Sequence, residues 1–135
     1  MAYTIQTIEG IGAAMGKKLA KANINTVEKL LDQCCTPKGR KNAAAATGID
    51  KSKLLKWTNM ADLMRIKGIA SQYGELLKAS GVDTVKELRN RKPVNLTAKM
   101  TEVNAKKKLT RMVPSEKMVS NWVNAAKKLK PAISY

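Results

Sequence analysis

The sequence predicts an all-α protein made of two pseudo-equivalent halves with additional packing helices. The segment IEGIG at residues 8–12 returns fifty-eight residues later as IKGIA at residues 66–70. A short apolar helix and a second, capped helix follow each copy, and the apolar spacing elsewhere is helical rather than alternating. Residues 8–33 and 66–91 agree at turn, core and cap positions, as an internal duplication would leave them. The identical pairs are Ile8/Ile66, Gly10/Gly68, Ile11/Ile69, Gly16/Gly74, Leu19/Leu77, Thr26/Thr84, Val27/Val85 and Leu30/Leu88.

We assign residues 1–57 to the first half and residues 58–135 to the second. No stretch rich in Gly, Pro or Ser separates the halves, so we expect one continuous compact unit. The core of this unit must be largely aliphatic, because the 135 residues include no Phe, three Tyr and two Trp.

Capping residues mark the helices of the first half. Thr26 is in the N-cap position before VEKLL, where its hydroxyl can accept a hydrogen bond from the first turn. Thr36 and Pro37 begin an alanine-rich helix that stops at Gly48, because proline suits the first helical position and glycine the position after the last. Asp50 caps the next helix, whose main side chains are Leu54, Leu55, Trp57, Thr58 and Ala61.

The second half repeats the threonine cap and then departs from the first half. Thr84 is the N-cap before VKELR, and Ser115 caps a final helix. Between Leu96 and Pro114 the second half is longer and more basic than its counterpart. We expect residues 131–135 to form a short frayed tail. The apolar stripe of the final helix consists of Met118, Val119, Trp122, Val123, Ala126 and Leu129.

The two tryptophans lie at matching steps of the halves. Trp57 and Trp122 each follow a capping residue, Asp50 or Ser115, by seven positions. A tryptophan can be a stacking platform for bases, but placement within apolar stripes favours a core position for both.

Cysteine usage argues against disulfide, metal and nucleophile chemistry. Cys34 and Cys35 are adjacent, and neighbouring cysteines rarely meet disulfide geometry, so we expect two reduced thiols at a helix end. With two cysteines and no histidine, the common zinc sites cannot be assembled, and a thiol nucleophile lacks its usual base. We therefore expect no metal, no cofactor and no catalytic residue.

The charge of the chain favours an anionic partner. Twenty-six Lys and Arg residues face ten Asp and Glu residues, which gives a formal net charge of +16. Residues 1–57 hold ten basic and four acidic side chains and residues 58–135 hold sixteen and six, which excludes a basic tail on a neutral domain. Such an excess attracts polyanions. The densest positive patch, which either extends a binding surface or is a solvated helix end, is Lys106, Lys107, Lys108 and Arg111.

A membrane surface is the other polyanion that a basic chain can meet. No segment approaches the roughly 20 apolar residues of a spanning helix. The start MAYTIQTIEG has neither the basic region nor the apolar region of a signal peptide. We therefore expect a cytoplasmic protein without a membrane partner.

The turn at Gly10, Ile11 and Gly12, here called hairpin one, is the candidate ligand site. We expect both glycines to be required for a sharp turn at a helix start, where several N–H groups lack an intrahelical acceptor and can bind an anion. The pattern resembles the helix-hairpin-helix motif, whose members usually grip the DNA backbone through these amides without reading bases. Ile8 and Leu19 should pack beneath the turn. The lysines on the emerging helix are Lys17, Lys18 and Lys21.

The second copy of the turn, here called hairpin two, departs from this pattern. It keeps Gly68 and Ile69, whereas Ala70 replaces the second glycine. Glu75 and Leu76 stand where the first copy has two lysines. We therefore expect hairpin two to hold DNA less well than hairpin one, or not at all. A Gly-x-Gly at a helix start is also common as a simple tight turn, and similar modules serve as protein-binding or structural units.

The wider resemblance covers nearly the whole chain. The order of elements, TPKGRK at residues 36–41 and ADLMRIKGI at residues 61–69 resemble an uncharacterised family of bacterial helix-hairpin-helix proteins, catalogued as a domain of unknown function. This resemblance implies the fold rather than an activity. The second half, with GVDTVKEL at residues 81–88, also resembles the C-terminal domain of the bacterial RNA polymerase alpha subunit, where a similar hairpin meets DNA.

Three classes of function follow from these features. The leading prediction is a non-enzymatic protein that binds double-stranded DNA, or another nucleic acid, independently of sequence, in a nucleoid or repair-accessory role. The alternative is a protein-interaction adaptor whose hairpins dock another chain, including a second copy of this one. An enzyme such as a helix-hairpin-helix DNA glycosylase is disfavoured, because it needs a larger fold around a base pocket and an acidic residue in a catalytic context.

Overall fold

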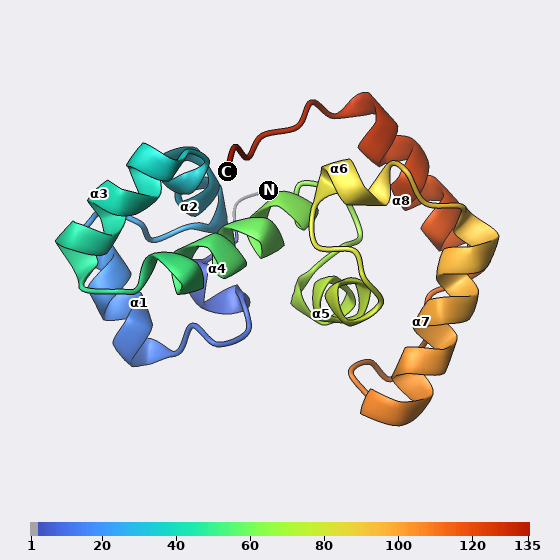
Figure 1. Cartoon of the computed structure of the whole chain (residues 1–135). Coiled ribbons are helices and arrows are strands. Elements are labelled where there is room, and N and C mark those ends of the chain that lie inside the picture. Colours follow the sequence, from blue (N-terminus) through green and yellow to red (C-terminus); the bar gives the residue numbers. More distant parts are fainter. Residues whose placement is uncertain (1–2) are drawn as a thin grey trace. The chain divides into compact units, whose positions relative to one another are not determined.

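The computed structural model describes residues 3–135, and every regular element within them is a helix (Figure 1). The all-α prediction is therefore confirmed. Within the same residues, the only strand-like pairing is an isolated bridge between Thr4 and Thr26. The elements are η1 (Ile5–Thr7), α1 (Ala13–Ala20), α2 (Val27–Cys34), α3 (Pro37–Thr47), α4 (Lys51–Leu63), α5 (Ser71–Ala79), α6 (Val85–Leu88), α7 (Pro93–Lys107) and α8 (Glu116–Lys128).

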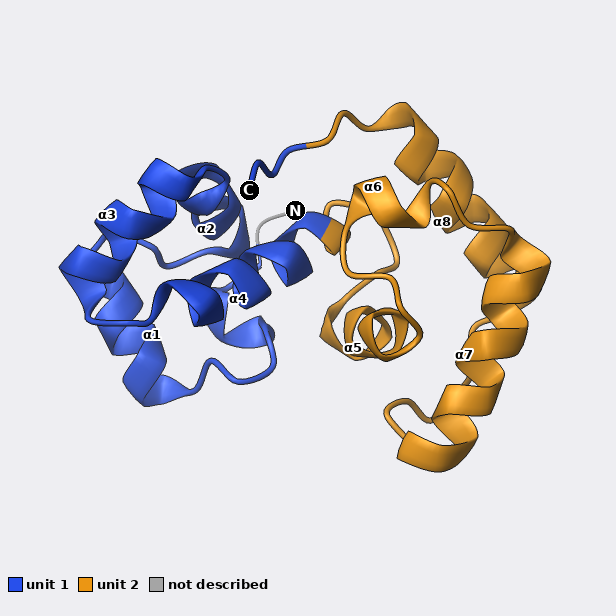
Figure 2. Cartoon of the chain, in the orientation of Figure 1, with its two compact units in different colours: residues 1–62, 132–135 blue, residues 63–131 orange. Residues whose placement is uncertain are grey.

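The chain divides into two compact units (Figure 2). Unit 1 contains the residues up to Asp62 together with Ala132–Tyr135, and unit 2 contains Leu63–Pro131. Each unit buries its own set of aliphatic side chains. Hairpin one therefore belongs to unit 1 and hairpin two to unit 2.

The core of unit 1 is mainly aliphatic and is contributed by η1 and helices α1 to α4. Trp57 is buried in unit 1, as its place in an apolar stripe predicted. Burial of these side chains is the main favourable contribution to folding. The large side chains that are fully buried in unit 1 include Ile8, Leu19, Ile24, Leu30 and Leu54.

The helix caps predicted for unit 1 are present. The hydroxyls of Thr26 and Thr36 accept hydrogen bonds from the backbone N–H three residues ahead, at 3.1 and 3.0 Å. Gly48 ends α3 with a φ of +75°, a left-handed conformation that glycine adopts without strain. Asp50 directly precedes α4, and a hydrogen bond from the Ser52 hydroxyl lowers the pKa of the Asp50 carboxyl.

Unit 2 packs the short helices α5 and α6 against the longer helices α7 and α8. Helix α7 contacts both α5 and α8, and α6 contacts α8. Trp122 is buried as predicted, with its ring centroid 5.3 Å from that of Tyr73. The caps at Thr84 and Ser115 are also present, with N–H to hydroxyl distances of 3.3 and 3.1 Å. The core of unit 2 includes Leu76, Leu77, Val82, Val85, Leu88, Leu96, Met100, Val119, Val123 and Ala126.

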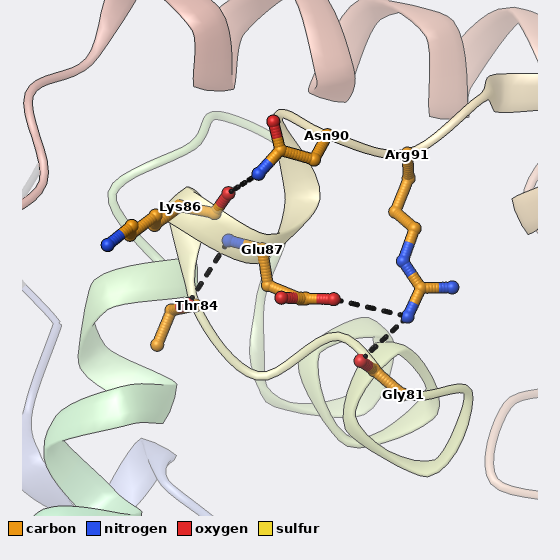
Figure 3. A network of polar contacts seen from close by, with 6 residues as sticks. All are labelled: Gly81, Thr84, Lys86, Glu87, Asn90 and Arg91. Carbon is orange, nitrogen blue, oxygen red and sulfur yellow. Dashed lines mark hydrogen bonds and ion pairs between the residues drawn. The ribbon is translucent and has the colours of Figure 1, made fainter.

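A polar network joins the end of α6 to the turn that follows α5 (Figure 3). Arg91 Nη2 donates to the carbonyl oxygen of Gly81 at 3.0 Å and pairs with the Glu87 carboxylate at 3.3 Å. Asn90 Nδ2 donates to the carbonyl oxygen four residues before it at 3.1 Å. The Arg91 and Glu87 side chains are partly exposed, so this pair orients the segment more than it stabilises the fold.

The C-terminal segment is docked on unit 1, so the prediction of a frayed tail was wrong. The N–H of Ser134 donates to the carbonyl oxygen of Cys35 at 2.8 Å. The Arg40 guanidinium donates to the carbonyl oxygens of Ser134 at 2.8 Å and of Cys34 at 2.9 Å. Arg40 is 5% exposed, and a buried guanidinium needs acceptors for its fixed N–H donors. The backbone of the tail supplies one of them.

Candidate nucleic-acid interface

Hairpin one is a tight turn that leads into α1. Gly10 has a φ of +93°, a conformation that L side chains rarely adopt. The N–H of Ile11 is used within the turn, where it donates to the carbonyl oxygen of Ile8 at 3.1 Å. Gly12 is the N-cap of α1, with a φ of −87° and a ψ of −168°. This extended backbone suits any residue, so the expectation that the turn requires both glycines is wrong for Gly12.

Hydrogen-bond donors and cations lie together along α1. The first bond of the helical ladder runs from the N–H of Gly16 to the carbonyl oxygen of Gly12 at 2.9 Å. The N–H groups of residues 13–15 therefore precede the ladder, and Gly12 has no side chain to cap them. Residues 12–14 are exposed. The lysines that follow are exposed as well, in the last turn of α1 or at its C-cap, and are Lys17, Lys18 and Lys21.

Hairpin two has the same backbone geometry as hairpin one. Gly68 has a φ of +95°, and the N–H of Ile69 donates to the carbonyl oxygen of Ile66 at 3.1 Å. Ala70 is the N-cap of α5, with a φ of −104° and a ψ of −172°, and it is exposed. The N–H of Gly74 donates to the carbonyl oxygen of Ala70 at 2.8 Å. The exchange of glycine for alanine thus leaves the turn intact, because alanine adopts extended backbone freely.

A tryptophan lies against each hairpin. A Cβ atom added at Gly10 would be 3.5 Å from Nε1 of Trp57, and one added at Gly68 would be 3.1 Å from Nε1 of Trp122. The two indoles are therefore core side chains that back the turns. Ile8 and Leu19, which we expected to pack beneath hairpin one, are buried. Ile11, the central residue of the turn, is buried as well.

The two hairpins differ in the helix that follows. Lys18 is exposed on α1, whereas Leu76 at the equivalent place on α5 is fully buried. Leu76 belongs to the same core as Leu96 and Met100, which are residues of α7, and Glu75 is half-buried. Helix α7 contacts α5 and contributes to the core in which Leu76 is buried. A lysine at position 76 would have to bury its ammonium group, so the apolar residue there has a packing reason.

A basic pocket in unit 1 was not predicted from the sequence. It has a volume of about 490 Å³ and lies between the starts of α3 and α4. The run KGRK at residues 38–41 was visible in the sequence, but the contribution of α4 depends on the fold. The residues that line the pocket are Pro37, Lys38, Arg40, Lys41 and Lys51.

The cysteines are free thiols at the end of α2, as predicted. Burial raises the pKa of the Cys34 thiol in spite of its hydrogen bond with Thr58. A protonated, buried thiol is a poor nucleophile. Among residues 3–135, no group of three or more His, Cys, Asp or Glu side chains could hold a metal ion. In the described part of the chain, no helix combines the length and apolar character that crossing a membrane requires.

Comparison with known proteins places the chain in one family. No curated protein and no solved structure matches it. A family model described as a domain of unknown function matches residues 9–129. This range includes both hairpin turns and, among the described residues, all the α-helices. The chain therefore belongs to the DUF4332 family, a domain of unknown function.

Proposed function

We propose that this protein binds the phosphate backbone of double-stranded DNA independently of base sequence, with hairpin one as the principal contact. The observation that carries the proposal is the start of α1. There the N–H groups of residues 13–15 precede the helical ladder beside an uncapped, exposed Gly12. Such groups, at the positive end of a helix dipole, favour a phosphate. Three exposed lysines follow on the same helix or at its C-cap.

The composition of α1 supports recognition without base reading. Its sequence AAMGKKLA contains no Arg, Asn or Gln, the side chains that most often form paired hydrogen bonds with base edges. Backbone amides and lysine ammonium groups contact phosphates, which every duplex shares. The net charge of +16 adds attraction at long range.

Both hairpins are helix-hairpin-helix motifs in this proposal, and the two halves are copies of one motif. The matched turns support this reading, as do matched bonds after α1 and α5. The N–H of Ile24 donates to the carbonyl oxygen of Leu19 at 3.0 Å, and the N–H of Val82 donates to that of Leu77 at 2.9 Å. The resemblance of residues 81–88 to the RNA polymerase alpha C-terminal domain adds a precedent for DNA binding.

The role that fits such binding is nucleoid organisation or assistance to DNA repair, without catalysis. The adaptor alternative would be favoured if Ala70 had spoiled the turn of hairpin two and if the purified protein did not bind DNA. The backbone at Ala70 keeps the geometry of hairpin one, so the first of these conditions is not met. We therefore prefer nucleic acid to a protein as the partner.

Fluorescence anisotropy of the full chain with labelled duplexes tests the proposal. Two duplexes of equal length and composition but scrambled sequence should bind with affinities that differ by less than about tenfold, roughly 1.4 kcal/mol. If about four to six phosphates are engaged, the logarithm of affinity should fall against the logarithm of salt with a slope of roughly −4 to −5. A single strand and an RNA duplex, measured in parallel, define the preferred nucleic acid.

Two results contradict the proposal. Binding that persists at high salt, or that favours one scrambled duplex by more than about tenfold, would mean that bases are read. A chain that binds none of these nucleic acids at low salt has another partner.

A further inference from the structure

Unit 2 contains a basic pocket at the C-terminal end of α7. Its volume is about 550 Å³. In Figure 1 the chain turns back at the end of α7 (orange) and runs toward α8. The pocket is lined by the last residues of α7, by the turn that follows them and by one residue of α5, Gln72. The lining side chains with hydrogen-bond donors from α7 and this turn are Asn104, Lys108, Thr110 and Arg111.

A buried asparagine fixes the shape of the turn. Asn104 is 9% exposed, and its amide Nδ2 donates to the carbonyl oxygen of Thr110 at 3.1 Å. The N–H of Thr110 donates to Asn104 Oδ1 at 3.0 Å, so the two residues exchange a pair of bonds. Lys108 is the C-cap of α7 with a φ of +50°, and its N–H donates to the carbonyl oxygen of Asn104 at 2.9 Å. The Lys108 and Arg111 side chains therefore project from a held backbone rather than from a loose loop.

The pocket is strongly cationic. Lys108 and Arg111 line it and are exposed, and among the described residues no acidic side chain lines it. Lys106 and Lys107 are exposed in the last turn of α7 next to it. Four cations within six residues, in a recess with polar donors, produce a potential that favours a phosphate group.

The position of the pocket connects it with hairpin two. Gln72 is the second residue of α5, the helix that begins directly after Ala70. Helix α7, which contacts α5 and contributes Leu96 and Met100 to the core that contains Leu76, ends at this pocket. The turn after α7 therefore places cations near the start of α5. Helix α5 itself has Glu75 and Leu76 where α1 has lysines.

We propose that the pocket formed by Gln72, Lys108 and Arg111 binds a backbone phosphate of nucleic acid. Unit 2 then has a phosphate site whose cations come from the turn after α7 rather than from the helix after its hairpin. This inference rests on the proposed DNA binding and extends it to a second contact. The guanidinium of Arg111 offers paired donors to phosphate oxygens, and Lys108 adds a point charge.

A pair of double variants of the full chain tests this site. Lys108→Gln with Arg111→Gln should make the salt dependence of duplex binding shallower by about one unit of slope, because one phosphate contact is lost. Glutamine removes the charge at Lys108 but keeps a polar side chain and the Cβ that the left-handed backbone already accepts. The matched control is Lys127→Gln with Lys128→Gln, in the last turn of α8, which removes the same charge. It should change the slope by less than about half a unit.

Lysine acetylation followed by mass spectrometry gives a second readout. Saturating duplex should protect Lys108 from the reagent by at least about fivefold, while Lys127 stays reactive, because phosphate contact hides an ammonium group. Equal slopes for the two double variants, or an unprotected Lys108, would overturn the inference.

The two proposals fail in different ways. If the wild-type chain binds the duplex and loses affinity with Gly12→Asp, but the pocket variant behaves like its control, only the second site is refuted. If the wild-type chain does not bind nucleic acid, the proposed function fails, and the second site fails with it.

Discussion

Gly12 and Ala70 occupy equivalent places before α1 and α5. A glycine can matter there because it adopts left-handed backbone or because it has no side chain, and the structure distinguishes these two reasons. A left-handed backbone is found at Gly10 and Gly68, not at Gly12. A Cβ atom at Gly12 would have no neighbour within 4 Å. In the proposed function, Gly12 therefore matters through the side-chain cap that it lacks, which leaves the N–H groups of α1 available to a phosphate.

Gly12→Asp should lower duplex affinity by more than about tenfold, roughly 1.4 kcal/mol. Aspartate is a favoured N-cap residue, so the fold should survive while its carboxylate takes the amides and repels a phosphate. Ala70→Asp should cost less, because α5 has no lysine equivalent to Lys18 beside it. Anisotropy titrations measure both losses, and circular dichroism checks the fold. Gly12→Ala is the control and should bind like wild type. Equal losses for the two aspartate variants would show that hairpin one is not the principal site.

Gly39→Ala should lower the free energy of unfolding by about 2 to 3 kcal/mol. A Cβ atom at Gly39 would collide with the backbone carbonyl oxygen of Gln33 in α2. No rotamer change relieves a backbone contact, and overpacking commonly costs about 1 to 3 kcal/mol. Urea denaturation measures the change. Gly12→Ala, which adds the same methyl group in open space, should leave stability nearly unchanged. A Gly39→Ala variant as stable as its control would mean that α2 and α3 are not so close.

At the scale of elements, α1 and α5 illustrate how one helix pattern serves two surroundings. Both helices follow a turn of the same geometry and have a buried glycine in the first turns, Gly16 or Gly74. Helix α1 then exposes Lys17 and Lys18, whereas α5 buries Leu76 in the core to which α7 also contributes. The chemistry of each helix is set by what covers it, and an uncovered α1 can present its cations to a phosphate backbone.

Lys17→Gln with Lys18→Gln should make the plot of log affinity against log salt shallower by about one to two units. The two ammonium groups lie on the helix that presents the unpaired amides, so each should neutralise a phosphate. The control is Lys53→Gln with Lys56→Gln, which removes the same charge from exposed positions of α4. Identical slopes for the two double variants would mean that only the total charge of the protein matters.

At the scale of the whole molecule, the fold joins two segments of unit 1 that lie far apart in the sequence. The segment Ala132–Tyr135 belongs to unit 1, although Leu63–Pro131 stands between it and the rest of that unit. The buried Arg40 joins it to the end of α2 through carbonyl oxygens of Ser134 and Cys34. The tail is therefore a structural part of unit 1.

Removal of residues 132–135 should lower the free energy of unfolding by about 1 to 3 kcal/mol, since a buried donor left without its acceptor costs this much. The Arg40 guanidinium loses the carbonyl oxygen of Ser134, and the Cys35 carbonyl oxygen loses a donor. Urea denaturation is the measurement. Ser134→Ala keeps both backbone groups and should behave like wild type. If the truncated chain is as stable as Ser134→Ala, the tail contributes nothing to the fold.

Local chemistry is predictable from this sequence because it depends on residues close together in the chain. The threonine and serine caps at Thr26, Thr36, Thr84 and Ser115 were found where the sequence placed them, since each hydroxyl reaches an N–H only three residues ahead. The sharp turns at Gly10 and Gly68 and the inward tryptophans followed for the same reason.

The sequence by itself therefore determined the helical class, the starts of α2, α3, α4, α6 and α8, the end of α3 at Gly48 and the two hairpin turns. Only the tertiary structure decided that Leu76 shares a buried core with residues of α7, that the tail docks on Arg40, and that Gln72 lines one pocket with the turn after α7. These contacts join segments that lie tens of residues apart. The spacing of apolar residues along one helix shows which face is buried, but it does not show which distant segment packs against that face. Burial of apolar surface and the need of buried donors for acceptors select them when the chain closes on itself.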